Sequence, residues 1–459
     1  MLAVRAVCRH LNTVSSGNPV WRQLFQRCLG VAVPRPFFLP KALKITSARD
    51  LEGALRKWRG GWEPVRPVQC SRRPVCWAKI HTREVLHNTS VITPGGRWII
   101  SGYTDGSVWY LDLGDDTTAP LELTPHLLIP SSFSDDFVAE HEIQIRLAPD
   151  FLSDESLGPS STSHTLLQFN IAVVTGDPLQ THVGVWSVHV DTESGATSTL
   201  KLGGKVSSFV DVGDAYPQSA CLYGRFLGYC LSLNDTTCVV IIDWAEADGK
   251  GHDDGILRWY VPLEAAKSMY LLPGDRLFTA DDYDNASLYN WRTDCPSSTL
   301  PPSQQELDPV DPYWHRRLDR TLYFDGIVTP TILHGSVQVI IPSDEEVISV
   351  KIPLDPSASE DYTHILSIIK KPEYEIARQL RAFGHRQGVG LSADHVLTLI
   401  RYCSEDGVGG ELLPTRVQSF ECPDLTEMKN PPDCLLYDEF SQRVMLMDAE
   451  LSYTLTVDT

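Results

Sequence analysis

The strongest structural signal of the chain lies in GGRWIISGYTDGSVWYLDL, residues 95–113. Two runs of strand-forming residues, rich in Ile, Val, Trp and Tyr, flank the turn residues Thr104, Asp105 and Gly106. Asp-Gly pairs readily adopt the backbone conformations of a tight turn between antiparallel strands. The segment is therefore predicted to form a β-hairpin.

Three related segments follow, and each has a strand, a polar turn and a second strand that ends near a tryptophan. They cover residues 166–190, 222–244 and 271–291. Together with Trp109 of the first hairpin, the tryptophans of these segments are Trp186, Trp244 and Trp291. Their uneven spacing fits one supersecondary unit repeated with loop insertions. Three weaker hairpins lie in residues 335–352, 396–422 and 434–457.

These repeats resemble the blades of a WD-type β-propeller. The resemblance implies a mainly β fold, a β-propeller of about seven blades over residues 85–459. Seven blades would average about 54 residues, above the ~40 to 45 of a compact blade, so six or eight blades stay open. Residues 114–165 are rich in Ser, Thr, Asp and Pro, and this composition predicts a long, solvated loop insertion.

The composition is that of an ordinary globular chain. Of the 459 residues, 42% are hydrophobic and 21% are charged, which argues against disorder. No uncharged apolar run is long enough to cross a bilayer, so no membrane contact is expected. The 11 cysteines are an odd number without a Cys-x-x-Cys pair, which favours a reducing compartment over a disulfide framework or a zinc ribbon.

Charge divides the chain into two parts. The net charge is −20, but residues 1–84 carry +12 and the remainder carries −32. Such an acidic body repels a phosphate backbone, so nucleic-acid binding is not expected. Residues 1–49 contain no acidic residue, as in mitochondrial transit peptides, and mitochondrial import is therefore an alternative to a cytoplasmic and/or nuclear location.

The first sixty residues show helical periodicity. Apolar residues at positions 2 to 14 recur at steps of three and four, which predicts an opening helix. Asn18 is predicted to cap a second helix, with Pro19 in its first turn. A third helix is predicted near residues 47–59, with Ser47 and Asp50 as a capping box. Helices this short must bury their apolar faces against something else.

Val7-Cys8-Arg9-His10-Leu11, a polar turn ending in Asn18-Pro19, and then Trp21 and Leu24 resemble the second half of an F-box. In that family these two helices pack with a Skp adaptor, which joins a substrate-binding domain to a cullin ubiquitin ligase. The first half of the motif has no counterpart, because Met1 falls inside its second helix. We expect either a start assigned too far downstream or the loss of part of the adaptor contact.

Together the two resemblances imply a small α-helical F-box-like segment before the propeller. Partial F-box helices would occupy residues 1–30, and a linker that contains the third helix would occupy residues 31–84. Their partners would be a Skp-type adaptor, through it a cullin, and an unknown protein substrate held by the propeller. The residues assigned to adaptor binding are Leu2, Val7, Cys8, Leu11, Trp21 and Leu24.

The predicted function is that of a non-catalytic substrate-recognition subunit of a Skp-cullin-F-box ubiquitin ligase. Two alternatives stay open: a propeller scaffold without ligase coupling, and a propeller enzyme with a site on the central channel. The local signatures of phosphate, dinucleotide, zinc-protease and hydrolase sites do not occur, so no catalytic, cofactor or metal residue is predicted. The alternation around Gly184 and Trp186 is interpreted as strand packing rather than ligand contact.

Overall fold

The computed structural model describes most of the chain in short continuous segments. The described residues are 17–28, 34–39, 43, 46–60, 69–75, 87–114, 123–133, 143–157, 166–176, 180–191, 199–212, 217–233, 236–251, 254–263, 268–280, 285–300, 308–317, 330–333, 335–342, 346–355, 364–370, 380–391, 396–401, 416–421, 434–447 and 453–458. Among them, no helix is both long and apolar enough to cross a bilayer.

The described strands form seven antiparallel sheets, which we number along the chain. Sheet 1 contains β2 (His87–Ile92), β3 (Trp98–Tyr103), β4 (Val108–Asp112) and β5 (Pro125–Ile129). Sheet 2 contains β6 (Gln144–Asp150), β7 (Gln168–Gly176), β8 (Gln180–Asp191) and β9 (Thr199–Val212). Sheet 3 contains β10 (Ser219–Tyr223), β11 (Phe226–Leu233), β12 (Thr236–Asp243), β13 (Arg258–Leu263) and β17 (Ser297–Ser298).

The remaining four sheets follow the same order of hydrogen-bonded neighbours. Sheet 4 contains β14 (Ser268–Leu272), β15 (Arg276–Ala280), β16 (Asn285–Asn290) and β18 (Trp314–Arg317). Sheet 5 contains β19 (Thr331–Leu333), β20 (Ser336–Pro342), β21 (Glu346–Pro353) and β22 (His364–Lys370). Sheet 6 contains β23 (Leu380–Phe383), β24 (Gln387–Leu391), β25 (Val396–Arg401) and β26 (Arg416–Glu421). Sheet 7 contains β27 (Cys434–Asp438), β28 (Arg443–Met447), β29 (Tyr453–Asp458) and β1 (Gln69–Pro74).

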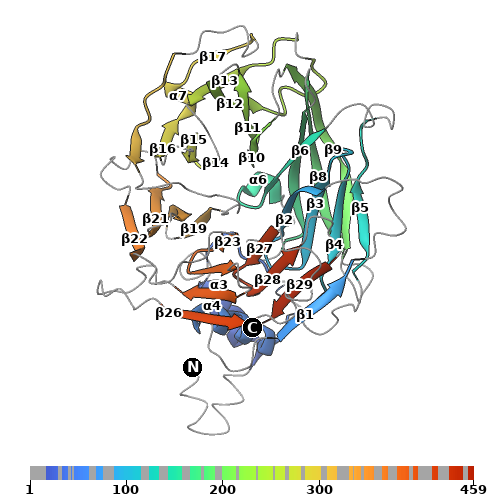
Figure 1. The fold of residues 1–459 in the computed structure, drawn as a ribbon, viewed down its shortest axis with the longest axis vertical. Helices are drawn as coiled ribbons and strands as arrows, with labels where there is room; N and C mark the ends of the chain where they lie inside the picture. Colours follow the sequence, from blue (N-terminus) through green and yellow to red (C-terminus); the bar gives the residue numbers. More distant parts are fainter. Residues whose placement is uncertain are drawn as a thin grey trace.

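Figure 1 shows these sheets placed one after another around a common centre. The mainly β prediction is confirmed. The hairpin of residues 95–113 forms as expected, because the carboxylate of Asp105 accepts a hydrogen bond from the Ser107 amide at 2.8 Å and Gly106 adopts a φ of 80°. The four tryptophans of the repeat lie in or directly after the third strand of sheets 1 to 4.

Two stretches differ from expectation. Residues 114–165, predicted as a loop insertion, contain β5, β6 and the short helix α6 (Asp154–Leu157), so that prediction is wrong in part. The expected linker, residues 31–84, contains β1. Both β1 and β5 are outermost strands with a proline and polar residues, and such edge strands lack the alternating apolar pattern that identifies a buried strand.

Sheet 7 joins the first strand of the chain that the structure describes to the last three. Its outer strand β1 runs antiparallel to β29, with Gln69 opposite Asp458 and Pro74 opposite Tyr453. Next to it, sheet 1 packs on sheet 7 through an apolar cluster that includes Ile99, Leu111, Met445 and Met447. Neighbouring innermost strands are also in contact, among them β27 with β2, β2 with β6, and β6 with β10.

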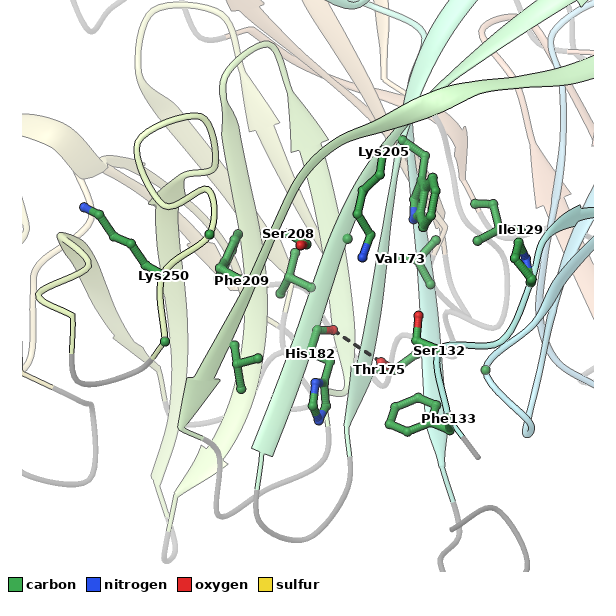
Figure 2. A pocket seen from close by; sticks show the side chains of 18 residues that line it. Ile129, Ser132, Phe133, Val173, Thr175, His182, Lys205, Ser208, Phe209 and Lys250 are labelled. Carbon is green, nitrogen blue, oxygen red and sulfur yellow. Dashed lines mark hydrogen bonds between the residues drawn. The ribbon is translucent and has the colours of Figure 1, made fainter. Parts of the chain in front are cut away.

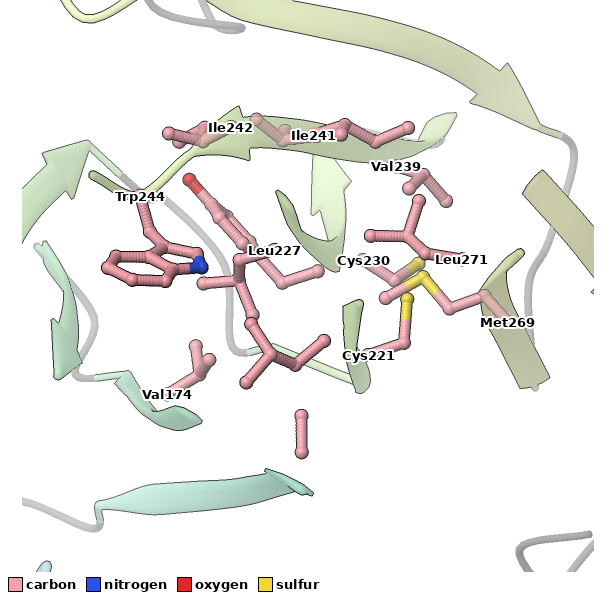
Figure 3. Packing of buried hydrophobic residues seen from close by; sticks show 14 of the residues in the cluster. Val174, Cys221, Leu227, Cys230, Val239, Ile241, Ile242, Trp244, Met269 and Leu271 are labelled. Carbon is pink, nitrogen blue, oxygen red and sulfur yellow. The ribbon is translucent and has the colours of Figure 1, made fainter. Parts of the chain in front are cut away.

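The largest apolar cluster lies among sheets 2, 3 and 4. Figure 3 shows Cys221 and Cys230 of sheet 3 beside Met269 and Leu271 of β14. Burial raises the pKa of each of these two thiols to about 12, so both stay protonated at neutral pH. These cysteines pack as small apolar residues and are poor nucleophiles.

Buried carboxylates connect the turns of neighbouring sheets. Asp150, the last residue of β6, accepts a hydrogen bond from the amide of Gly224 in sheet 3 at 2.8 Å. Asp438, the last residue of β27, likewise accepts one from the amide of Gly95 in sheet 1 at 3.1 Å. The same carboxylate–amide hydrogen bond therefore occurs at two sheet junctions. Each bond satisfies a turn amide that packing would otherwise leave unpaired.

A fully buried ion pair joins sheets 2 and 3. Asp211 of β9 and Arg258 of β13 are both inaccessible to solvent, and the closest nitrogen and oxygen lie 2.6 Å apart. The Tyr229 hydroxyl donates to the same carboxylate, and the guanidinium also donates to the carbonyl of Ile256 at 2.8 Å. Burial opposes the charge on Arg258, but Asp211 outweighs this effect and raises the pKa of the guanidinium.

Asp211→Asn should lower the free energy of unfolding by about 3 to 5 kcal/mol, because it leaves Arg258 buried without its counter-charge. Urea denaturation followed by tryptophan fluorescence measures the change. Arg258→Met alone should be similarly destabilising, and the double variant should lose less than the sum of the two. A single Asp211→Asn variant as stable as the parent would contradict this role of the pair.

Glu439 follows β27 and connects sheet 7 to sheet 6. Its carboxylate accepts hydrogen bonds from the amides of His385, at 2.5 Å, and Arg386, at 2.8 Å. Burial raises the pKa of this carboxyl to about 8, although the two amides act in the opposite direction. The folded chain therefore holds a proton on Glu439 over a pH range in which the unfolded chain releases it.

The free energy of unfolding should fall as pH rises from about 5 to about 8, since the folded state binds the Glu439 proton more tightly than the unfolded state does. The contribution is complete below the ordinary glutamate pKa and lost above the raised one. Denaturation midpoints measured across this interval test the slope. Glu439→Gln should flatten it, and an identical slope in that variant would assign the pH dependence to other groups.

Candidate functional site

Two described helices precede the sheets and form a helical pair: α3 (Asn18–Cys28) in the predicted F-box region and α4 (Ala48–Gly60) in the predicted linker. Ser47 caps α4 as predicted, because its Oγ accepts from the Asp50 amide at 3.1 Å. The Asp50 carboxylate accepts from that hydroxyl, at 2.7 Å. Asn18 acts differently from the prediction. Its side chain accepts a hydrogen bond from the Ala48 amide at 2.6 Å, so it caps the neighbouring helix and ties the two together.

Trp21 lies inside the chain rather than on its surface. It is 4% exposed and belongs to one apolar cluster with Phe25, Leu51 and Leu55. Leu24 is only partly buried at the margin of this cluster. Of the residues assigned to adaptor binding, Leu2, Val7, Cys8 and Leu11 lie outside the described part of the chain. The ring of Trp21 is thus covered by the chain's own residues.

An extended segment, residues 34–39, attaches the helical pair to the sheets. Arg35 exchanges two backbone hydrogen bonds of 2.8 Å with Ile332 of β19, and its guanidinium lies 2.9 Å from Asp154 of α6. The ring of Phe37 packs edge-on against Phe440 of sheet 7, with centroids 4.9 Å apart. The helical pair is therefore fixed to three sheets or their connections.

A cleft of about 360 Å³ opens between sheets 1 and 2 (Figure 2). We name it the sheet 1–2 cleft. Its lining residues are Gly106, Ile129, Pro130, Ser132, Phe133, Val173, Thr175, His182, Val183, Gly184, Trp186, Lys205, Ser208, Phe209, Val210, Gly249, Lys250 and Gly251. It adjoins the β3–β4 turn, whereas residues 34–39 approach sheets 1 and 2 from the opposite ends of their strands.

The floor of the cleft is one face of sheet 2. Val173, Gly184 and Ser208 occupy opposed positions on β7, β8 and β9, and all three line the cleft. A side chain at Gly184 would place its Cβ 2.9 Å from Nε1 of Trp186. The glycine therefore lets the Trp186 indole lie close across the strand, where Lys205 packs over it with the ammonium 5.2 Å from the ring centre.

Two loops form the walls and are themselves held by hydrogen bonds. The loop after β12 binds the outer edge of β9, with the Gly249 amide 2.8 Å from the Ser208 carbonyl and the Ser208 amide 2.9 Å from the Asp248 carboxylate. On the other side Ser131 donates to the Asp105 carbonyl and accepts from the Phe133 amide. The cleft is therefore preformed by ordered backbone.

The lining is basic in an acidic protein. It contains Lys205, Lys250 and His182, whereas no Asp or Glu is among the described lining residues. Figure 2 shows the ammonium of Lys205 directed into the cleft and that of Lys250 directed away from it. Within the described chain Lys205 has no ion pair, and its contact is with the Trp186 ring. Lys205 is solvent-exposed, and its ammonium is therefore accessible to an anionic group that enters the cleft.

The hydroxyl of Thr175 and the imidazole of His182 lie in the same cleft but have separate partners. The Thr175 hydroxyl donates to the backbone carbonyl of His182 at 3.3 Å, so it is not activated by the imidazole. The His182 ring instead packs edge-on against Phe133, with centroids 5.3 Å apart. No group of three or more potential metal ligands occurs among the described residues.

Sequence reasoning missed this cleft. The alternation around Gly184 and Trp186 is strand packing on one face, as predicted, but on the other face both residues line the cleft. The one sequence signal is Gly184 two residues before Trp186. Recognising that Lys205 lies opposite Trp186 requires the register of β8 with β9. That register contains an irregularity beside Trp186, which the sequence pattern does not specify.

Comparisons with known proteins do not assign the chain to a family. No family model matches it, and no curated protein matches it. Among solved structures, the chain is similar to the β-propeller domain of Cps50 (Swd1) from Myceliophteria thermophila, with 12% sequence identity and a TM-score of 0.46. The match covers 82% of this chain and 97% of that one. The fold described above rests on its own sheets and their order.

Trp21→Ala should lower the free energy of unfolding of the helical pair by about 3 to 5 kcal/mol, because it opens a cavity between α3 and α4. Hydrogen exchange of the α3 and α4 amides measures the loss locally. Gln23→Ala, at an exposed position of the same helix, is the matched control and should change protection little. Equal protection in both variants would mean that Trp21 does not hold the pair together.

Proposed function

We propose that the seven sheets are the blades of a closed β-propeller and that the chain is a non-catalytic protein-recognition scaffold. The pairing of β1 with β29 and the contacts of sheet 7 with sheets 1 and 6 support closure. A propeller presents loop-built faces on a rigid body, and such faces hold a partner without any moving part.

The observation that carries the proposal is the preformed sheet 1–2 cleft. Its walls come from sheet 1 and from the loop of sheet 3, and its floor is sheet 2. A cation, two aromatic rings and several hydroxyl groups converge there without a hydroxyl or histidine placed as nucleophile and base. Concave sites with a few placed polar groups on an apolar lining are suited to binding.

A second candidate is the recognition subunit of a Skp-cullin-F-box ubiquitin ligase. It is favoured by the formation of α3 at the predicted Asn18-Pro19 start and by the rigid attachment of the helical pair through residues 34–39. A fixed distance between adaptor and target would favour ubiquitin transfer by proximity. Because Trp21 is buried, the adaptor would have to contact the outer side of α3, where Leu24 is partly exposed.

Affinity capture of the full chain from cells, with quantitative mass spectrometry, tests the scaffold. Ser132→Trp adds bulk at the exposed wall of the cleft and should reduce the enriched partners about tenfold, the equivalent of about 1.4 kcal/mol. Ser297→Trp, at an exposed serine of sheet 3, is the matched control and should retain them. Partners that survive both substitutions would contradict recognition through this cleft.

The same capture separates the two candidates. A Skp adaptor and a cullin should accompany the parent chain only if it serves a ligase, and Leu24→Asp should then deplete both. Circular dichroism of that variant checks that α3 still folds. If partners are enriched without a Skp adaptor or a cullin, the scaffold function is retained and the ligase role is rejected.

A further inference from the structure

The sheet 1–2 cleft contrasts in charge with the molecule that surrounds it. The chain holds 59 acidic and 39 basic residues, yet the described lining has only basic titratable groups. Two of the described carboxylates on the loop after β12 are engaged with backbone, since Asp248 accepts from the Ser208 amide and Asp254 accepts from the Gly251 amide at 2.7 Å. Among the described lining residues, Lys205 is the charged group directed into the cleft.

The cation type in the cleft, a lysine ammonium rather than a guanidinium, indicates which anionic group it is suited to bind. Phosphate groups carry close to two negative charges and are generally bound by clusters of arginine, whose forked guanidinium donates two parallel hydrogen bonds. The described lining contains no arginine, and only one lysine is directed into it. A single ammonium over an aromatic ring matches the single charge of a carboxylate. The hydroxyl groups of Ser132 and Ser208 add neutral donors to the same lining.

The surroundings of the cleft favour an extended peptide over a compact small molecule. Leu127 on β5 and Val206 on β9 are 50% and 44% exposed, and these two strands flank the cleft and contact each other. Exposed apolar side chains beside a polar hollow are typical of protein-binding surfaces. A segment that places a carboxylate at Lys205 could lay its neighbouring apolar side chains on this rim.

We propose that the sheet 1–2 cleft binds an extended, carboxylate-bearing segment of a partner protein, with Lys205 as the ionic anchor and Trp186 and Phe133 as apolar contacts. This inference rests on the proposed recognition function and names its ligand class. Gly184 sets the depth of the site, because any larger residue would displace the Trp186 indole on which Lys205 packs.

Fluorescence anisotropy with the full chain and a labelled synthetic peptide, in which glutamate alternates with leucine, tests the inference. The glutamate peptide should bind at least about tenfold more tightly than a twin with glutamine in place of glutamate. Added salt should weaken its binding, because the interaction is ionic and partly exposed. Equal affinity of the two peptides, or no binding of either, would overturn the assignment.

Two lysines of one strand provide a matched pair of variants. Lys205→Gln should weaken binding of the glutamate peptide about tenfold. Lys201→Gln removes the same charge from β9, but that ammonium is 2.6 Å from Asp191 and outside the described lining, so the affinity should change less than about twofold. An equal loss in both variants would reduce the effect to net charge and overturn the role of Lys205.

Two further arms identify the occupant. A phosphoserine twin that binds more tightly than the glutamate peptide would overturn the preference for carboxylate. The chain's own sequence contains Asp135 and Asp136 shortly after Phe133. If the peptide binds only after Asp135→Asn and Asp136→Asn, the chain supplies its own anion and the partner assignment falls.

Failure of this inference can be told from failure of the recognition function. Partners captured from cells that depend on the Ser132 wall, together with no discrimination between the peptides, would retain recognition and reject the anionic ligand class. Loss of both the captured partners and the peptide discrimination would reject the two together.

Discussion

The structure depends on the pairing of β1 with β29, which brings an early segment of the chain into the last sheet. Residues 69–74 complete sheet 7 by hydrogen bonds to residues 453–458, and the turn residues Asp438 and Glu439 of the same sheet bind amides of sheets 1 and 6. Local hairpins can form one at a time, but these bonds form only between distant parts of the sequence. They couple the stability of the first and last sheets.

This coupling also determines where the helical pair lies. The chain passes from α4 to β1, so a helical pair that precedes β1 must lie near sheet 7, and Phe37 meets Phe440 there. The two backbone bonds between Arg35 and Ile332 hold the same segment against sheet 5. The apolar faces of α3 and α4 pack against each other and against Phe37. The helical pair therefore packs on the sheets, and the buried Trp21 contributes to the stability of the fold.

Local chemistry explains what the sequence could predict. The hairpin of β3 and β4 follows from Asp105 and Gly106, and the cap of α4 follows from Ser47 and Asp50, because both depend on residues within a few positions. Long-range geometry explains what it could not. The outer strand β1 has no apolar alternation, and Asn18 caps a helix thirty positions away, so neither is visible in a local pattern.

The cleft belongs to the second kind of feature, and for the same physical reason. Gly184, Trp186 and Lys205 meet only because β8 and β9 pair in a register with an irregularity beside Trp186. Each residue alone has an ordinary explanation: a strand glycine, a packed tryptophan, a solvated lysine. Their juxtaposition places a cation over an aromatic ring in a hollow without described carboxylates. The net charge of −20 repels anionic segments at a distance, so under the proposal a segment needs apolar residues that also fit the rim in order to remain bound.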